Sequence, residues 1–422
     1  MIPVLIRIML LTSLWLAASP ATAQDGHYYT LRRDRLFSML KSGEAALIPG
    51  AWEEELESFR QSNNFYYFSG IEQPNLLLLI SPDSRSREVL YLPARNLEDG
   101  NLSEAWTGDK LGPGSKTEKL TGIAKAAEMG TLNTVLAGMA GGLNRLYFDY
   151  LPSEIGGPKS GAEVMLETIA TRYPHIQIVP LSRLVDSLRT VKDSVEIATL
   201  QQAVNITGKA LEETIEALRP GMYEYEAEAL IEYGFHRRGS QRPGFPSIVG
   251  SGPNSVTLHY NENRRRIEAG EMVVMDVGAE LDYYTADITR TVPSSGKFTP
   301  RQREIYQVVL DAQMAATAAV KPGVTLRQVH EAAKKVIDEA GFGEYFIHYT
   351  SHFLGMDVHD VGSRDDELRP GMVITVEPGI YIGAEMLGVR IEDNVVVTEI
   401  GSLVLSRNIP KTVAEIEALM KH

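Results

Sequence analysis

Residues 270–290, GEMVVMDVGAELDYYTADITR, decide the fold of this chain. The apolar, β-branched run after Gly270 is typical of a buried strand, and residues 283–289 predict a second strand that pairs with it as a hairpin. Each half carries an acid in a largely apolar setting, Asp276 in the first and Asp287 in the second. Because acids are seldom buried without a partner, this pair needs a chemical reason.

The position of the turn determines how close the two acids lie. A two-residue turn at Leu281-Asp282 places Asp276 directly opposite Asp287, with Cβ atoms about 4.5–5.5 Å apart. Two carboxylates at that distance repel by roughly 3 kcal/mol at an effective dielectric constant near 20. A buried pair therefore requires a proton or a bound cation between the carboxylates. The alternative is a turn elsewhere, with one aspartate facing water.

A second stretch, residues 371–393, repeats the pattern as GMVITVEPGIYIGAEMLGVRIED. In both stretches a glycine precedes the first acid by six residues and another glycine follows it by two, the acids being Asp276 and Glu377. The second acid of the later copy is Glu392, which corresponds to Asp287. This pattern indicates an internal duplication of a hairpin that carries two acids. Four buried carboxylates favour hard divalent cations, and we expect two of them.

Histidines cluster near these acids in the sequence. Of nine histidines, three lie in FIHYTSHFLGMDVHD, namely His348, His352 and His359, and His259 lies in VTLHY. A lone histidine is more often an ordinary core residue, but three in one short segment favour a functional site. Gly355 and the alternating apolar pattern predict an extended or loop path for this segment. We expect one of these histidines to be a metal ligand and the others to contact substrate.

The order Asp, Asp, His, Glu, Glu on these strands resembles the pita-bread metallopeptidases, a group that includes methionine aminopeptidase, aminopeptidase P and prolidase. The segments SHFLGMDVHD, VEPGIYI, VRIEDNVVVT and SIVGSGPNSVTLHY are most similar to motifs of aminopeptidase P, over about residues 30–420. The metal ligands that this resemblance implies are Asp276, Asp287, His352, Glu377 and Glu392. It also implies substrate contacts for His259, His348 and His359.

The resemblance implies hydrolysis of the bond between an N-terminal residue and a following proline. Two cations would activate a water, with Asp287 and Glu392 bridging them, Asp276 on one metal, and His352 and Glu377 on the other. This carboxylate-rich set suits manganese, with cobalt, iron or zinc as alternatives.

The remaining roles belong to groups that act on protons or on the substrate. Glu377 would also carry the proton from the water to the leaving nitrogen. His359 and His259 would stabilise the tetrahedral intermediate and hold the substrate backbone. An imide bond to proline has no N–H and carries a rigid ring, so a dedicated pocket is expected. The residues expected to line or order that pocket are His348, Tyr381 and Arg390.

The predicted fold class is α+β, with an α/β domain at residues 24–188 and a pita-bread catalytic domain at residues 189–422. In the first domain, the runs NLLLLISP, EVLYLP, RLYFDY and IQIVPL predict strands of a mixed sheet. In aminopeptidase P such a domain serves assembly and narrows the site, so we expect a homo-oligomer, a dimer or tetramer. A long outer helix is predicted where apolar residues recur every three or four positions from Ile197 to Leu218, and Pro220-Gly221 ends it. A second outer helix is predicted with Thr299 as its cap.

Composition limits the other partners. A net charge of −14 argues against nucleic-acid binding through a basic surface, and the absence of cysteine excludes disulfides and a thiol nucleophile. Residues 1–23 resemble a signal peptide, with Arg7, a short apolar run and a small-residue cleavage site at Ala21-Thr22-Ala23. We therefore expect an exported protein, periplasmic or secreted, without stable membrane insertion after cleavage. The alternative is an uncleaved anchor.

Three alternative functions remain open from the sequence. One is a dipeptidase that cleaves only Xaa-Pro dipeptides. Another is a metal-free hydrolase of the creatinase kind, and the third is a non-catalytic binding protein on the same fold. The complete set of five ligands argues against the last two.

Overall fold

The computed structural model describes residues 26–52, 59–94, 110–150 and 157–421. The predicted signal peptide and its cleavage site lie outside these residues. In the described part of the chain, no helix has the length and apolar character needed to cross a bilayer.

The N-terminal part is built on a six-stranded sheet with the order β4-β3-β2-β1-β5-β6. β1 pairs antiparallel with β2 and parallel with β5, so the sheet is mixed as predicted. The four strands expected from the sequence are β2, β3, β5 and β6, whereas β1 and the short β4 were missed. The strands are β1 (Glu44–Pro49), β2 (Leu77–Ile80), β3 (Glu88–Leu92), β4 (Ala126–Glu128), β5 (Arg145–Phe148) and β6 (Gln177–Pro180).

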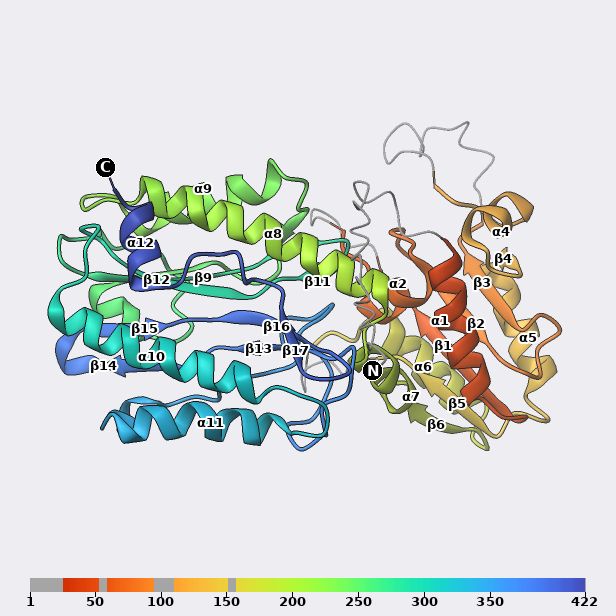
Figure 1. The fold of residues 1–422 in the computed structure, drawn as a ribbon. Coiled ribbons are helices and arrows are strands. Elements are labelled where there is room, and N and C mark those ends of the chain that lie inside the picture. The colour runs from red at the N-terminus through yellow and green to blue at the C-terminus, as the bar shows by residue number, and fades with distance from the viewer. Residues whose placement is uncertain (1–25, 53–58, 95–109, 151–156, 422) are drawn as a thin grey trace, which may run out of the picture.

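Helices pack around this sheet on the right of Figure 1. Their starts follow local capping where the sequence supplies it: Ser160 and Glu163 form a capping box at the start of α6. The helices are α1 (Gly26–Met39), α2 (Asn63–Ser69), α4 (Ser115–Thr121), α5 (Leu132–Met139), α6 (Gly161–Arg172) and α7 (Ser182–Thr190). The predicted domain boundary after residue 188 falls in the last turn of α7, and its position stays a prediction.

The C-terminal part consists of antiparallel ladders. β12-β9-β8 and β13-β16-β17 are three-stranded, as is β11-β10-β7, and β14 pairs with β15. The first strands are β7 (Arg242–Pro243), β8 (Ile248–Ser251), β9 (Met272–Val277), β10 (Ala279–Leu281), β11 (Tyr284–Thr285) and β12 (Ile288–Pro293). The later ones are β13 (Val373–Val376), β14 (Gly379–Ile382), β15 (Leu387–Arg390), β16 (Asp393–Val397) and β17 (Ser402–Val404).

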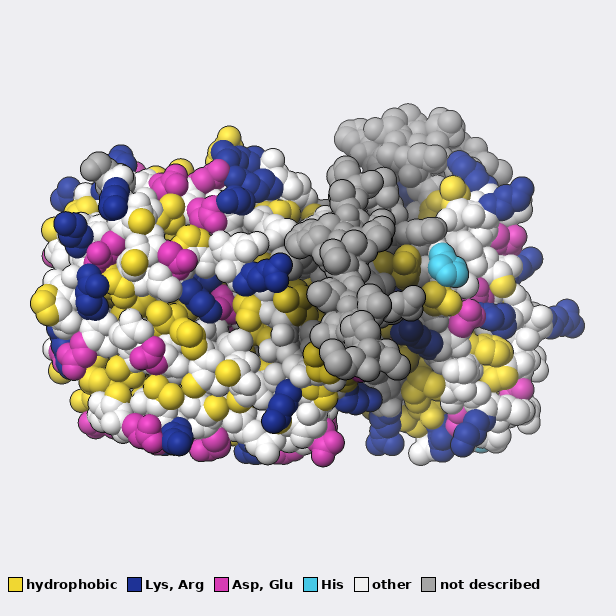
Figure 2. Space-filling view, viewed as in Figure 1, with side chains coloured by type: hydrophobic (Ala, Val, Ile, Leu, Met, Phe, Trp, Pro, Cys, Tyr) yellow, Lys and Arg dark blue, Asp and Glu magenta, His cyan; other side chains and the backbone are white. Residues whose placement is uncertain are grey.

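Helices lie outside these strands, with α8 and α9 along one side and α10 and α11 along the other (Figure 1). The predicted cap at Thr299 is confirmed: its side chain accepts from the backbone N–H of Gln302, and Pro300 is the first helical residue. The helices are α8 (Ser194–Ala217), α9 (Glu224–His236), α10 (Pro300–Ala319), α11 (Leu326–Glu339) and α12 (Val413–Leu419). On the face in Figure 2, acidic and basic side chains are interspersed over this part, without a continuous basic patch among the described residues.

The predicted register of the first hairpin was wrong. Asp276 pairs with Thr289, because the turn is at Asp282-Tyr283, one residue later than expected. When the turn moves by one residue, the residue opposite each strand position changes by two. Asp287 is therefore a diagonal neighbour of Asp276 on the same face of the hairpin. Both turn residues have positive φ, 45° and 73°, a conformation uncommon for a tyrosine.

Contacts with the N-terminal part hold this turn. The ring of Tyr283 stacks on Tyr66 with centroids 3.8 Å apart, and the guanidinium of Arg60 lies 4.6 Å from its centroid. The Tyr283 hydroxyl donates to Glu72 at 2.9 Å. Tertiary packing therefore selects a turn that local propensity does not favour.

The second hairpin has the same layout, with an outer pair, β13 and β16, and an inner pair, β14 and β15. Because Val376 pairs with Asp393 and Gly379 with Arg390, Glu377 lies opposite Glu392 between these pairs. The two hairpins meet where the Glu392 N–H donates to the carbonyl of Thr289 at 3.1 Å. This junction brings the four acids together.

Candidate active site

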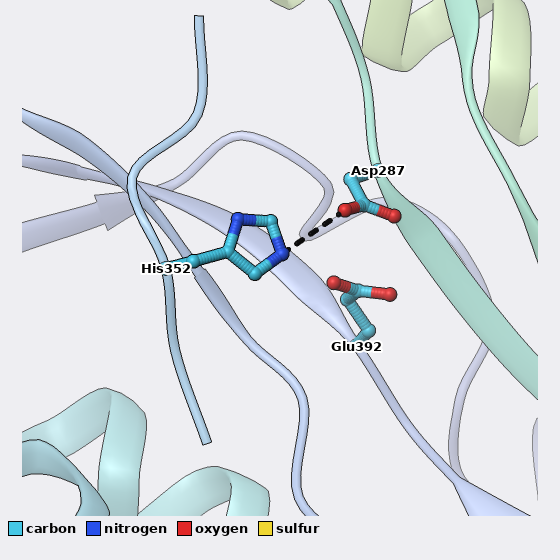
Figure 3. A group of neighbouring side chains, drawn as sticks. All are labelled: Asp287, His352 and Glu392. Atoms are coloured by element: carbon cyan, nitrogen blue, oxygen red, sulfur yellow. Dashed lines mark ion pairs between the residues drawn. The ribbon is translucent and has the colours of Figure 1, made fainter. Parts of the chain in front are cut away.

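Each of the five predicted metal ligands lines one pocket of about 570 Å³ in the catalytic part. The acids come from equivalent places in the two hairpins, either within a strand or beside its end. Asp287, His352 and Glu392 each offer a ligand atom within 4.8 Å of the others (Figure 3). Histidine and acids that are far apart in sequence therefore converge on one point.

The orientation of His352 suits a metal ligand. Its Nδ1–H donates to the carbonyl of Phe353 at 3.0 Å, so the lone pair is on Nε2 in the neutral ring. Nε2 lies 3.3 Å from Asp287 Oδ2 and 3.5 Å from Glu377 Oε1. A lone pair that faces two carboxylate oxygens is repelled unless a cation or a proton lies between them. A metal-binding imidazole usually donates the N–H of its other nitrogen to a carbonyl or carboxylate in this way.

Two of the carboxylates also have an oxygen that is available to bind a cation. Among the described residues, Asp276 Oδ1 and Glu392 Oε1 are buried without a hydrogen-bond partner. Burial, and then repulsion from Asp276, raises the pKa of Asp287 well above its usual value. Burial, and then repulsion from Asp287, does the same for the pKa of Glu392. Positive charge at this point would satisfy the unpaired oxygens and relieve the repulsion, so these residues fit divalent cations.

Three polar residues that the sequence analysis missed hold the ligands. Thr289 donates to Glu392 Oε2 at 2.7 Å, and Thr375 accepts from the backbone N–H of His352 at 3.2 Å. The side chain of Asn394 accepts from the N–H of Asp287 at 3.1 Å. Each of the three lies two residues from a predicted acid ligand, so strand alternation was the signal that would have found them.

A hydrogen-bonded chain lies beside the acids. His348 Nδ1–H donates to the carbonyl of Tyr349 at 2.8 Å, and the Tyr381 hydroxyl lies 2.9 Å from His348 Nε2. Arg390 donates to that hydroxyl at 2.9 Å and to Asp276 Oδ2 at 2.6 Å. Burial, and then the charge of Arg390, lowers the pKa of His348 to about 4. Neutral His348 therefore accepts from Tyr381 O–H.

These hydrogen bonds refine the expected roles of His348, Tyr381 and Arg390 at the substrate pocket. His348 and Arg390 line the pocket, whereas Tyr381 is buried outside its wall. Tyr381 can thus orient His348 through their hydrogen bond, but its side chain does not line the pocket where substrate would bind.

The two other histidines also line the pocket. His359 lines it with its ring 4.4 Å from that of His352, at an interplanar angle of 83°. Burial, and then the neighbouring His352 and His259, lowers the pKa of His359. His259 lines the same pocket from a different segment, with its ring exposed. Both rings can therefore meet a bound peptide.

Comparison with known proteins places this geometry in a family. Residues 198–399 match metallopeptidase family M24, and residues 29–147 match the aminopeptidase P N-terminal domain. The Xaa-Pro aminopeptidase of Escherichia coli strain K12 is 35% identical, over 92% of this chain and 96% of its own length. The chain belongs to metallopeptidase family M24. This M24 enzyme is accordingly a metal-dependent hydrolase of the aminopeptidase P type.

Further matches agree with both parts of the fold. The solved structure of Pseudomonas aeruginosa aminopeptidase PepP superimposes with a TM-score of 0.85 and 32% identity, over 94% of this M24 chain and 98% of that one. The predicted pita-bread catalytic domain with a preceding α/β domain is thus confirmed. The Xaa-Pro dipeptidase of Pyrococcus furiosus is 40% identical, but over only 58% of this chain and 70% of its own.

The rest of the M24 pocket wall was not predicted. Most of these further lining residues are apolar. They include one guanidinium, that of Arg364, whose Cζ lies 4.1 Å from the centroid of the Tyr349 ring. These residues come from separate segments and follow no periodic pattern, although Ile248, Leu258, Ser351 and Val358 lie in motifs that carried the resemblance. They are Phe245, Pro246, Ile248, Leu258, Asn261, Tyr349, Ser351, Val358 and Arg364.

Proposed function

We propose that this M24 enzyme removes one N-terminal residue from peptides whose second residue is proline. The observation that carries the proposal is the cluster of three buried acids, the partly exposed Glu377 and His352 in a pocket that is also lined by apolar side chains. The E. coli relative that matches along both domains bears this activity in its name, whereas the dipeptidase matches a smaller share of the chain.

We also propose the metal content. Asp276, Asp287, His352, Glu377 and Glu392 would hold two divalent cations, and manganese suits a set of four carboxylates and one imidazole. When bound, such cations polarise the scissile carbonyl and lower the pKa of the attacking water. The unpaired oxygens of Asp276 and Glu392 support this assignment.

The protein's own groups would move the protons. Proline nitrogen carries no hydrogen in the peptide, so it must receive a proton to leave as an amine. Burial raises the pKa of Glu377 although His352 opposes the shift. Glu377 would take the proton from the attacking water and pass it to that nitrogen.

The neutral histidines would bind the substrate. His359, whose pKa is lowered by burial, would donate a hydrogen bond to the developing oxyanion, and His259 would hold the substrate backbone. His348, kept neutral and oriented by Tyr381, would face the substrate from the other wall. The apolar surfaces of Phe245 and Leu258 offer packing for a proline ring.

Peptide cleavage separates the two leading functions. The aminopeptidase should cleave Arg-Pro-Pro after arginine, cleave Arg-Ala-Pro far more slowly, and leave acetyl-Arg-Pro-Pro intact. Cleavage of Ala-Pro without cleavage of Arg-Pro-Pro would establish the dipeptidase instead. Failure of metal-loaded protein on every peptide would refute both functions.

We further propose that the enzyme is exported, periplasmic or secreted, and assembles as a homo-oligomer, a dimer or tetramer. Export is supported by the charged start, apolar run and Ala21-Thr22-Ala23 site of the sequence. Assembly is supported by the presence of an aminopeptidase P N-terminal domain. Light scattering of the purified protein would measure the subunit number, and a single-chain mass would refute assembly.

A further inference from the structure

The segment that carries His259 lines the pocket with three residues that are close together in the chain, Leu258, His259 and Asn261. It leaves β8 at Ser251, passes through the short 3-10 helix η3 (Gly252–Val256), and continues as a loop to Arg265. The ring of His259 is exposed and makes no hydrogen bond with any described residue. The orientation of His259 must therefore come from the backbone that bears it.

One buried carboxylate accepts hydrogen bonds from several parts of this segment. Glu224, in the first turn of α9, is 0% exposed. Its Oε1 accepts from the N–H and hydroxyl of Ser251 at 2.8 and 2.7 Å and from Asn254 Nδ2 at 3.1 Å. Its Oε2 accepts from the Tyr260 hydroxyl and the Arg265 N–H, both at 2.8 Å. The carboxylate thus binds the start, the middle and the end of the segment, including the neighbour of His259.

Ordinary roles do not account for this acid. No ion pair of Glu224 is found among the described residues, since the guanidinium of Arg265 binds Glu271 at 2.6 Å. Glu224 is not the helix cap either, because Glu226 receives the Tyr223 N–H at 2.7 Å. A buried carboxylate that accepts only from neutral donors and backbone N–H groups organises the groups that donate to it, and its removal leaves those donors unpaired.

A second anchor lies on the opposite side of the segment. The Gly388 N–H in β15 donates to the Ser255 hydroxyl at 2.9 Å. The backbones approach so closely that a Cβ at Gly388 would lie 1.9 Å from the carbonyl oxygen of Ser255. β15 also carries Arg390, which binds Asp276. The segment is therefore held between α9 and the hairpin that bears the acids, and His259 lies between the held residues Ser255 and Tyr260.

We propose that Glu224 is a positioning residue that fixes His259 against the substrate. The inference rests on the proposed role of His259 in substrate binding. It assigns a function to residues 223–230, YEYEAEAL, at the start of α9. The proposed metal and substrate contacts leave this segment unexplained. Because a displacement of about 1 Å at a catalytic group can cost about 100-fold in rate, loss of this carboxylate should reduce catalysis without touching the metal ligands.

The test is a double-mutant cycle in kcat/KM on Arg-Pro-Pro. Glu224→Gln should lower kcat/KM by about 10- to 100-fold. In a His259→Ala background the same change should have little further effect, since the group that it positions is already absent. Affinity for the product dipeptide Pro-Pro should weaken to the same level in either single variant. Metal content should equal that of the wild type.

Two further variants keep the test decisive. Tyr260→Phe removes a single donor, so it should show a smaller loss with the same dependence on His259, and it decides the matter if Glu224→Gln does not fold. Glu88→Gln is the matched control: Glu88 is also buried and accepts from Arg33 and the Ala124 N–H, but in the N-terminal sheet. Its effect on kcat/KM should be the same with and without His259.

Two outcomes overturn the inference in different ways. If Glu224→Gln lowers kcat/KM by the same factor in both backgrounds, Glu224 is only a structural residue. If His259→Ala costs nothing while wild-type enzyme cleaves Arg-Pro-Pro, the proposed role of His259 fails and its positioning fails with it, but the peptidase function stands.

Discussion

Replacing Asp360 by asparagine tests how the loop that carries the histidines is held. Asp360 accepts from Arg189 Nη2 at 2.6 Å and from Lys192 Nζ at 2.9 Å. The side chains of Asp360 and Lys192 are each 1% exposed, and that of Arg189 is 5% exposed. Both cations lie where α7 leads into α8, so this cluster ties the loop to the junction of the two parts.

The expected loss of stability follows from the hydrogen bonds that Lys192 and Arg189 would keep after the substitution. Among the described residues, Lys192 would keep the carbonyl of Thr190 at 3.4 Å, and Arg189 would keep Asn64 Oδ1 at 2.9 Å and the half-exposed Asp357 at 2.7 Å. Breaking a buried ion pair by removing one partner costs about 3–5 kcal/mol. For a domain of this size that corresponds to a fall in Tm of about 6–20 °C.

The effect should depend on pH with a definite sign. Burial alone would raise the pKa of Asp360, but Lys192 and then Arg189 outweigh it, so the pKa lies below its usual value. A depressed pKa means that the stabilisation is complete above the unfolded value of about 3.9 and is lost as the pH falls through the folded value. The difference between wild type and Asp360→Asn should be constant near neutral pH and should shrink below about pH 4.

Thermal unfolding at matched metal loading measures this difference. Asp365→Asn, in the same loop but 66% exposed, is the control and should leave Tm unchanged, because exposed ion pairs contribute little. A fall of less than about 2 °C for Asp360→Asn at pH 7, or an undiminished difference at pH 3, would refute the reasoning.

Four other outcomes are expected. Dialysis against EDTA should abolish peptide cleavage and lower Tm, and elemental analysis before dialysis should approach two ions per chain; active protein with no metal would contradict this. Glu377→Gln should lose at least about 100-fold in kcat while staying folded, as measured by circular dichroism, because the proton carrier is gone. Tyr381→Phe should lower kcat and leave metal content unchanged, since it only removes the link between Arg390 and His348; unchanged kinetics would exclude an ordering role. N-terminal sequencing of exported protein should begin at Gln24, and an intact Met1 would indicate an anchor.

Local patterns in the sequence predicted most of the elements that position the site and its four acids, and the resemblance to the pita-bread metallopeptidases implied His352 as the fifth ligand. A glycine, an apolar run and an acid recur with the same spacing around Asp276 and Glu377, and strand alternation places each second acid on the same face. The cap at Thr299 and the four predicted strands of the six-stranded N-terminal sheet also depend on neighbouring residues alone. β4 was missed because three residues are too few for a periodic signal.

Only the tertiary structure decided the register and the supporting contacts. The turn at Asp282-Tyr283 is selected by Tyr66 and Arg60, more than 200 residues earlier in the chain, against the backbone preference of a tyrosine. The positions of Tyr381 behind His348 and of Glu224 beneath the segment that carries His259 likewise come from long-range hydrogen bonds. By itself the sequence predicted which residues carry the chemistry, because the spacing of the acids is a local pattern and the resemblance to the metallopeptidases implied the roles of the histidines. How those residues are oriented depended on contacts between distant segments, since such contacts form only when the whole chain has packed.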